Sequence, residues 1–431
     1  MKIPIRFLFI PAIIMLNFFI APPVKAQSTE VLPTDSLCPQ RDLSDVVREL
    51  LDKPAKEKPS DQGSLLLLPI IQSNPATGFA FGVGGQYAFK VLHSNNYSLV
   101  MGSVQYTTKN QFIFMLKNNI YTKYDNFFLT GDWRYLIYSQ STYGLGTQAP
   151  EGGIIDYQYS LAGLETSPDS LAQPMKFNFI RLHQSLGYKI AQNIYVGLGY
   201  SYDSYSKLID EKLSLNPGDS LITSHYAFNK KYGFDTEKYL VSALNASFVI
   251  DKRDNMIMAY KGYYLSLKYR GGFEFLGSDR TSNLLSVEWR SFHGLSKRDP
   301  SHLIAFWVLG DFSEEGALPY MVLPATAYDQ RGRSSRGYTQ GRFRGTNMVY
   351  AEAEYRFPIS PCGGVLGGVL FVNATAANSP VLSVDLFDVI KPAAGFGLRI
   401  KADKNSRTNL AVDIGFGHQS AGFYLAASET F

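Results

Sequence analysis

The feature that most limits the fold of this chain is a two-residue alternation between apolar and small or polar side chains. In "GFAFGVGGQYAFKV", residues 78–91, Phe79, Phe81 and Val83 fall on one face of an extended chain, while Gly82 and Gln86 fall on the other. The same alternation returns at 193–202, 283–291 and 348–359. Because side chains alternate across a β-strand, these segments are predicted to be strands with one apolar face.

Alternation alone does not separate a soluble sandwich from a membrane barrel. In a sandwich the apolar face is buried and charged residues meet bulk water, whereas in a barrel the apolar face meets lipid and charged residues line the lumen. No stretch after residue 26 approaches the twenty apolar residues of a membrane-spanning helix, which excludes helical spans. The lengths of the segments and loops have to decide between the two β folds.

The sequence contains sixteen segments of roughly ten residues, an even number, as a closed single-chain barrel prefers. Connections after the even-numbered segments have ten residues or fewer, whereas 139–174, 206–237 and 312–345 exceed thirty. Short turns at one end and long loops at the other are typical of outer-membrane barrels. The prediction is an all-β transmembrane antiparallel β-barrel over residues 65–431, with strands at 65–73, 78–91, 96–107, 111–122, 126–138, 175–189, 193–205, 238–250, 261–273, 281–292, 301–311, 346–358, 364–376, 393–401, 408–417 and 421–431.

Residues 1–26 have the pattern of a secretory signal peptide. Lys2 and Arg6 flank the start of an apolar run, and Val24 and Ala26 occupy the small-residue positions before a cleavage site. The mature chain is therefore expected to begin near Gln27. Export favours the bacterial cell outer membrane as the location and argues against a nucleic acid partner.

Residues 27–64 are expected to form a short periplasmic segment with one amphipathic helix over about 42–51. Asp42 is a plausible cap, and the apolar residues of this helix fall on one stripe. The segment is too short for an independent periplasmic domain. The helix could plug the lumen, rest at the periplasmic mouth, or be loosely tethered.

An arginine-rich stretch, "RGRSSRGYTQGRFRG" at 331–345, contains five arginines and no acid. The chain is nearly neutral once the signal peptide is removed, so the counter-charges of this stretch are expected elsewhere in the same molecule. A loop that enters a polar cavity and meets carboxylates there fits this composition. The alternative is a mobile outer loop whose arginines touch anionic lipopolysaccharide.

Residue types used in catalysis and metal binding form no recognisable pattern. Cys38 and Cys362 are expected to be two structural residues; a single bridge between them is possible, but nothing in the sequence supports it. The six histidines lack metal-ligand spacing, and neither a nucleophile elbow nor a phosphate-binding glycine loop is present. We therefore expect no catalytic residues, no metal and no cofactor, and do not expect an enzyme.

Several motifs resemble the BamA/TamA outer membrane protein assembly superfamily, also called the bacterial surface antigen family. They are "SFVIDKRDNMIMAYKGYYLSLKYRGG" at 247–272, "SSRGYTQGRFRG" at 334–345 with the following "AEAEYRFPI", and the closing segments "GGVLFVNATA", "AGFGLRIK", "LAVDIGFG" and "GFYLAASETF". The resemblance covers residues 65–431. It implies a barrel-only member that lacks periplasmic POTRA domains.

In that family the sixth extracellular loop folds into the lumen, and its motif arginine is held by acids on the inner wall. The resemblance implies that Arg336 is this arginine, that Gly337 permits the sharp tip and that Tyr338 packs it. A desolvated guanidinium needs carboxylate partners. The expected lumen partners are Glu352, Glu354 and Asp413, and the family's aspartate on a neighbouring strand is replaced here by Asn373.

The resemblance also assigns roles at the periplasmic turns and at the two terminal strands. The turn motif comprises Asp251, Arg253, Asp254 and Gly262, in which the arginine is expected to tie neighbouring turns together. Phe431 is expected to act as a C-terminal barrel signal on an apolar strand. Pro69 in the first strand is compatible with a weak seam against the last strand, although an ordinary kink explains it equally well.

The resemblance implies a barrel that assists the insertion or translocation of outer membrane components. The alternative is a passive or gated pore, or a lipid conduit, partly plugged by the arginine-rich sixth loop. A membrane-embedded hydrolase has little support in the sequence. Outer membrane lipids are the expected surroundings, with unfolded outer membrane proteins or a periplasmic partner protein as possible further partners.

Overall fold

The computed structural model describes residues 38–54, 63–74, 78–149, 172–217 and 219–431, and four two-residue strands between 154 and 170. The expected signal peptide, residues 27–37 of the segment after it, and residues 55–62 lie outside the described residues. Residues 39–431 form one compact unit. No helix in the described ranges has the length and apolar composition needed to cross a bilayer.

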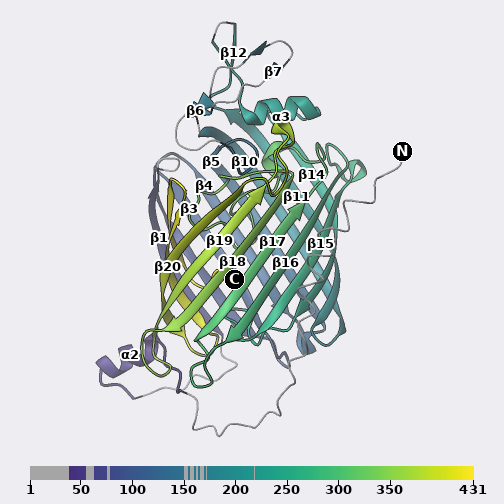
Figure 1. Ribbon diagram of the computed structural model, residues 1–431. Coiled ribbons are helices and arrows are strands. Elements are labelled where there is room, and N and C mark those ends of the chain that lie inside the picture. Colours follow the sequence, from purple (N-terminus) through teal and green to yellow (C-terminus); the bar gives the residue numbers. More distant parts are fainter. Residues whose placement is uncertain are drawn as a thin grey trace. The chain divides into compact units, whose positions relative to one another are not determined.

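Sixteen strands form one antiparallel sheet whose order follows the chain (Figure 1). This confirms the predicted antiparallel barrel architecture. The strands are β1 (Ser64–Asn74), β2 (Gly78–Lys90), β3 (Tyr97–Thr107), β4 (Phe112–Tyr121), β5 (Phe127–Thr142), β10 (Gln173–Ala191), β11 (Ile194–Asp210), β14 (Tyr239–Asp251), β15 (Gly262–Gly272), β16 (Ser282–Gly294), β17 (Leu303–Phe312), β18 (Asn347–Pro358), β19 (Leu366–Ala377), β20 (Ile390–Asp403), β21 (Thr408–Gly417) and β22 (Ser420–Ala426).

The remaining elements lie in the connections. Two-residue ladders join β6 (Ile154–Ile155) to β9 (Asp169–Ser170) and β7 (Ser160–Leu161) to β8 (Leu164–Glu165). The hairpin of β12 (Ser214–Asn216) and β13 (Asp219–Leu221) precedes helix α3 (Ser224–Tyr232), and α2 (Leu43–Leu50) precedes the barrel. Single 3-10 turns occur at Lys123–Asp125, Glu274–Leu276, Tyr320–Val322 and Pro380–Leu382.

The barrel has a short-turn end and a long-loop end. The long connections are 143–172, 211–238 and 313–346, and all three lie at the same end. We call residues 313–346 the sixth loop because it is the sixth connection at the long-loop end. The predicted difference between short turns at one end and long loops at the other is therefore present in the structure.

The alternation of the sequence becomes an apolar outer belt and a polar lumen. On β2, Phe79, Phe81 and Val83 are all nearly half exposed, while Ala80 and Gln86 on the opposite face are buried. Other strands repeat the pattern, so that apolar side chains stay exposed on the outside and charged ones are buried within. A soluble protein rarely exposes so continuous an apolar surface, whereas a barrel in lipid requires it.

Packed side chains close the long-loop end. Phe228 of α3 and Tyr320 and Met321 of the sixth loop belong to one buried apolar cluster, together with Phe177 and Tyr205 of the wall. The hydroxyl of Tyr320 lies 2.6 Å from that of Thr142. The loops therefore form a packed cap, because their apolar residues bury one another above the lumen.

The short-turn end is filled by the connection between β14 and β15, which we call the inward turn (residues 252–261). Its Met256 and Ile257 pack into one buried cluster of wall residues, and its Met258 packs into a second that contains Trp307. The side-chain oxygen of Asn255 accepts the backbone N–H groups of Ile257 and Met258 at 2.7 and 3.0 Å. This connection is therefore a folded plug as well as a turn.

The last strand is shorter than expected. The sequence pattern predicts a strand over 421–431, but β22 ends at Ala426, and residues 427–431 leave the wall as a C-terminal tail. Phe431 packs inside the barrel, with its ring centroid 5.4 Å from that of Trp307 and 6.1 Å from that of Phe292. Phe431 thus does not lie on an apolar strand as expected, because it is buried in a lumen cluster.

No ladder joins β1 to β22 among the described strands, so the sheet is open at one seam. The last strand pairs with β21 only from Ala411 onward, which leaves residues 408–410 without a partner on that side. The Nε2 atom of Gln86 donates to Oγ1 of Thr408 at 3.0 Å across this region. The fully closed barrel suggested by the even strand number is not observed.

The two cysteines differ from expectation. Cys38 and Cys362 are both disulfide-bonded, and the described residues contain no free cysteine. The structure shows the alternative that the sequence left possible but did not favour, because two positions so far apart in sequence give no indication of their spatial relation. The sequence therefore had no means of supporting or excluding the bond.

The open seam predicts weak protection of backbone amides from hydrogen–deuterium exchange in the two strands that border it. Amide hydrogens of β1 and β22 should exchange with deuterium earlier than those of β10 and β11, because seam edges lack inter-strand hydrogen bonds. Hydrogen–deuterium exchange mass spectrometry of the barrel in detergent micelles measures this directly. Equal protection of the four strands would contradict an open seam.

Candidate functional site: the arginine centre

Arg336 lies at the tip of the sixth loop and is fully buried within the barrel. Its Nη1 lies 2.7 Å from Oδ2 of Asp413, and its Nη2 lies 2.7 Å from Oε1 of Glu352. The same Nη2 also pairs with Glu354. The structure thus brings the motif arginine together with all three of the acids named from the sequence.

The strands place these acids by their two-residue period. Glu352 and Glu354 are alternate residues of β18, so both point into the lumen, and Asp413 points inward from β21. The outward-facing Ala353 separates the two glutamates. Two carboxylates at this spacing can form salt bridges with one guanidinium from the same side of the barrel wall.

The ionic contacts continue beyond Arg336. Arg356 lies 2.6 Å from Glu354, and Arg399 of β20 lies 2.5 Å from Asp413. Arg399 also lies 2.7 Å from Glu429 of the C-terminal tail. We call this set the arginine centre; it comprises Arg336, Arg356, Arg399, Glu352, Glu354, Asp413 and Glu429.

Hydrogen bonds offset the cost of burying so many charges. The Tyr350 hydroxyl donates to Oε2 of Glu352 at 2.5 Å, and Asn409 donates to Oε1 of Glu429 at 2.7 Å. The Nη2 atom of Arg356 donates to the backbone oxygen of Phe431 at 3.2 Å. A buried ionic group is tolerated when its remaining donors and acceptors are satisfied, and a missing partner then costs several kcal/mol.

The pKa values of the loop and tail groups are shifted by this arrangement. Burial alone would lower the pKa of Arg336, but the carboxylates of Glu352, Glu354 and Asp413 raise it well above its usual value. Burial would raise the pKa of Glu429, but Arg399 and Arg356 lower it to about 2. Both groups are therefore charged at neutral pH.

Aromatic and amide groups complete the contacts of Arg336 in ways that the sequence did not indicate. The guanidinium carbon lies 3.7 Å from the ring centroid of Phe371, a cation–π contact. Asn373 donates to the backbone oxygen of Arg336 at 2.9 Å and is 3.4 Å from Glu352. Asn373 therefore holds the loop backbone, whereas an aspartate at this position would add a further negative charge.

Close backbone approach explains the glycine of the loop motif. Gly337 has a φ of +107°, and a Cβ there would lie 2.8 Å from the Cβ of Ala393. On β21, a Cβ at Gly415 would lie 2.8 Å from the backbone nitrogen of Gly337. The hydroxyl of Tyr338 donates to the Pro392 carbonyl at 2.7 Å, so the tip is packed against the inner wall.

The other four arginines of the stretch donate to backbone carbonyls. Arg331 reaches the oxygen of Glu429 at 3.1 Å, and Arg333 reaches that of Leu425 at 2.9 Å. Arg342 and Arg344 donate to carbonyls within the cap, and the guanidinium of Arg344 also lies over the rings of Tyr320 and Tyr328. The expected carboxylate counter-charges are thus found at Arg336, and carbonyl oxygens contribute to the binding of the other four.

The turn motif is also assembled, with one difference in its connections. Arg253 makes a bidentate contact with Asp251 at 2.7 and 2.8 Å and stays within its own connection. A tie to another turn is made instead by Asp254, which lies 2.7 Å from Arg407 in the turn between β20 and β21, a turn that is not adjacent to its own along the sheet. Gly262 has a φ of +98°, a conformation that favours glycine.

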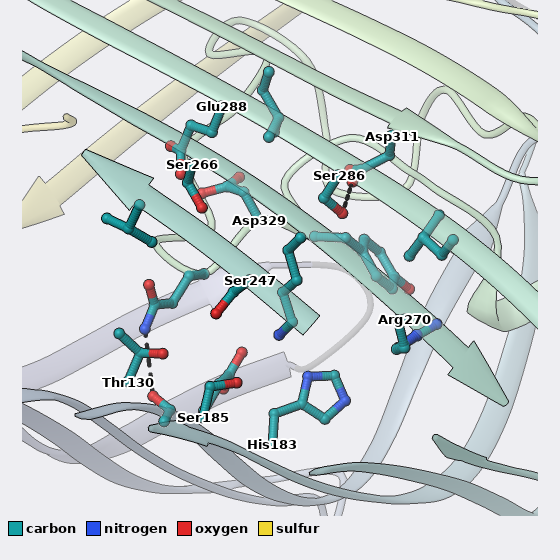
Figure 2. Close-up of a pocket in the computed structure, with 18 of the residues that line it drawn as sticks. Thr130, His183, Ser185, Ser247, Ser266, Arg270, Ser286, Glu288, Asp311 and Asp329 are labelled. Atoms are coloured by element: carbon teal, nitrogen blue, oxygen red, sulfur yellow. Dashed lines mark hydrogen bonds between the residues drawn. The ribbon is translucent and has the colours of Figure 1, made fainter. Parts of the chain in front are cut away.

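A polar chamber of about 250 Å³ lies between the sixth loop and the inner face of the barrel wall. Figure 2 shows Arg270 and His183 on one side of it and Glu288 and Asp329 on another. The chamber is also lined by Thr130, Ser185, Ser247, Ser266, Ser286 and Asp311 (Figure 2). No group of three or more His, Cys, Asp or Glu residues in the described ranges is placed to hold a metal ion.

Replacement of Arg336 tests the ionic anchor of the sixth loop. Arg336→Ala removes the arginine partner of Glu352 and one of the two arginine partners of Glu354 and of Asp413, which should cost about 3–5 kcal/mol and release the loop tip. A broad-specificity protease should then cleave the loop of the folded barrel faster.

Two further variants serve as controls. Arg333→Ala, which loses one carbonyl contact, should accelerate cleavage less. Adding Glu352→Gln to Arg336→Ala should restore part of the resistance to the protease. Unchanged cleavage of Arg336→Ala would contradict the anchor.

Acid titration tests the contact between the tail and the barrel wall. The pKa of Glu429 is lowered from 4.5 to about 2, so its stabilising contribution is complete above pH 4.5 and is lost as pH falls toward 2. The shift corresponds to about 3 kcal/mol. Thermal unfolding of the parent and of Glu429→Gln should therefore converge in midpoint over this pH interval. A constant difference across the interval would argue against the charged contact.

The model of the Omp85 superfamily domain matches residues 176–431. Among solved structures, BamA from Haemophilus ducreyi lacking POTRA domains 1-3 is 13% identical with a TM-score of 0.49, covering 85% of this chain and 69% of that one.

CdiB from Acinetobacter baumannii is also 13% identical with a TM-score of 0.47, covering 85% of this chain and 60% of that one. CdiB from Escherichia coli is 10% identical with a TM-score of 0.44, over 87% and 62% of the two chains. A search of curated proteins gave no match. The family match spans more than half of the sequence and includes the sixth loop and its acids, so the chain belongs to the Omp85 superfamily and is an outer membrane β-barrel.

Proposed function

We propose that this barrel assists the insertion or translocation of outer membrane proteins, and that it does so at the seam between β1 and β22. The observation that carries the proposal is the missing ladder between these two strands. A free strand edge presents unpaired backbone donors and acceptors, and an incoming strand can satisfy them by pairing. An unfolded outer membrane protein is a substrate of this kind.

The filled lumen supports a route at the seam over a route through the centre. The cap closes the long-loop end, while the inward turn and the C-terminal tail occupy the short-turn end. Passage along the lumen axis would require these packed clusters to separate. Movement at the seam requires far fewer contacts to break.

The sixth loop is connected to the last strand, which supports a role for the arginine centre in holding the seam. Arg333 donates to the carbonyl of Leu425 in β22, and the backbone N–H of Gly337 donates to the hydroxyl of Tyr424 at 2.8 Å. Arg331 donates to the tail carbonyl of Glu429. The loop tip, the last strand and the tail therefore share one set of contacts.

A gated conduit is the second candidate, and the polar chamber favours it. Hydroxyl groups and charges of both signs line the chamber, as a path for polar solutes would require. Its opening would depend on movement of the cap or of the inward turn. We propose a non-enzymatic role in either case, with outer membrane lipids as surroundings and unfolded barrels or a periplasmic protein as partners.

Depletion of the protein tests the first candidate. Other β-barrel proteins should decrease in the outer membrane fraction, because they depend on the seam for insertion or translocation. Quantitative proteomics of outer membranes measures the loss, and expression of the parent chain should reverse it while Arg336→Ala should reverse it less. An unchanged outer membrane proteome after depletion would count against the proposal.

Planar bilayer recording separates the two candidates. The packed ends of the lumen lead us to expect a nearly silent barrel. Steady, ion-selective conductance of the purified parent protein would favour the conduit instead. A variant with substitutions in the inward turn, such as Ile257→Ser with Met256→Ser, serves as a positive control for loss of the plug.

A further inference from the structure

We propose that α2 and the residue that follows it form a membrane-interfacial anchor, with their apolar stripe in the periplasmic leaflet of the outer membrane. The stripe comprises Leu43, Val47, Leu50 and Leu51. This inference rests on the location of the barrel in the membrane and is independent of the function proposed above.

The stripe is exposed along its whole length. Leu43 is 40% exposed, Val47 45%, Leu50 79% and Leu51 58%. At 100° per residue these four side chains lie on one side of the helix. No described part of the chain covers them, and exposing them to water would be unfavourable by the usual transfer free energy of apolar side chains.

The opposite side of α2 is fixed to the barrel. Asp42 caps the helix by accepting the N–H groups of Ser44 and Asp45, and its second oxygen accepts the N–H of Lys404 at 3.1 Å. Asp45 also pairs with the side chain of Lys404 at 2.8 Å. Lys404 lies in the turn between β20 and β21, so the helix is held at the periplasmic rim with its stripe turned away from the contact.

A second contact sets the position of the helix on the rim. The backbone N–H of Arg41 donates to the carbonyl of Gly363 at 2.9 Å, in the turn between β18 and β19. Lys401 of β20 also contacts the side chain of Gln40. Anchors on two neighbouring turns restrict the helix to the edge of the barrel beside the seam, and Figure 1 shows α2 at the short-turn end.

The lipid-facing belt of the barrel continues to this place. Ile359 and Leu366, which flank the turn that contains Gly363, are 49% and 44% exposed, and Leu398 of β20 is 55% exposed. These side chains belong to the outer face of β18, β19 and β20, which meets lipid. The stripe of α2 extends that apolar surface, and this continuity favours lipid as its occupant.

The polar side of the helix suits the headgroup region. Arg41 pairs with Glu49, and Arg48 donates to the carbonyl of Pro54, so basic and acidic groups alternate beside the stripe. Amphipathic helices of this kind lie in the membrane interface with their apolar face at the boundary of headgroups and acyl chains. An anchor at this point would hold α2 against the membrane next to the open seam.

Site-directed spin labelling of the full chain tests the anchor. Because both native cysteines are disulfide-bonded, a nitroxide can be attached to a single added cysteine. Leu50→Cys reports on the stripe, and Glu49→Cys, whose side chain is exposed on the polar side, is the matched control. Both proteins are placed in nanodiscs of phosphatidylethanolamine and phosphatidylglycerol.

Collision rates with oxygen, which concentrates in lipid, and with a water-soluble nickel chelate give the result. The ratio of oxygen to nickel collisions should be several-fold higher at position 50 than at position 49, and Val47→Cys should follow position 50. Equal ratios at both positions would place the stripe in water and overturn the proposal. Protection of position 50 from both reagents would show that protein covers the stripe and would also overturn the proposal. Dipolar broadening of the spectrum by the label of a second copy of the chain would do the same.

Discussion

The burial of the Arg336 guanidinium is the interaction on which the interior of this barrel depends. A charge can be held away from bulk water only if carboxylates surround it, and here Glu352, Glu354 and Asp413 do so from two strands. Those acids are in turn balanced by Arg356 and Arg399, which reach the C-terminal tail. Loop, wall and tail are therefore stabilised together, and loosening any one of them exposes charge in the others.

This coupling has a consequence for the seam. The last strand has no partner on its open side, so its position depends on contacts from within the lumen. Arg333 binds the carbonyl of Leu425, and the hydroxyl of Tyr424 accepts the N–H of Gly337. The final strand pairs with β21 on one side only, and on the other side a loop holds it in place of a strand. Such a barrel can open at the seam without losing the sheet, which agrees with the insertion role proposed for it.

Much of the interior could be predicted from the sequence, and the reasons are physical. Alternate residues of one strand share a face, so Glu352 and Glu354 had to point into the lumen if Ala353 between them faced lipid. Five arginines without an acid required counter-charges elsewhere in a nearly neutral chain. The backbone carbonyls that bind Arg331 and Arg333 were not predictable, because every residue has a carbonyl and only folding brings one within reach.

The sequence by itself determined the antiparallel barrel, its apolar outer face and an arginine-rich loop that needs counter-charges, because each follows from residue periodicity, loop lengths or charge balance along the chain. The choice of Arg336 within that loop came from the family resemblance. The tertiary structure alone decided the open seam, the inward path of residues 427–431, the disulfide state of Cys38 and Cys362, and the ring of Phe371 beneath Arg336. These depend on which distant segments meet. The terminal "SETF" directly follows an apolar strand in the sequence, but Glu429 lies inside the barrel and not in the wall. Its carboxylate pairs there with Arg399 and Arg356, which a position in the strand would not allow.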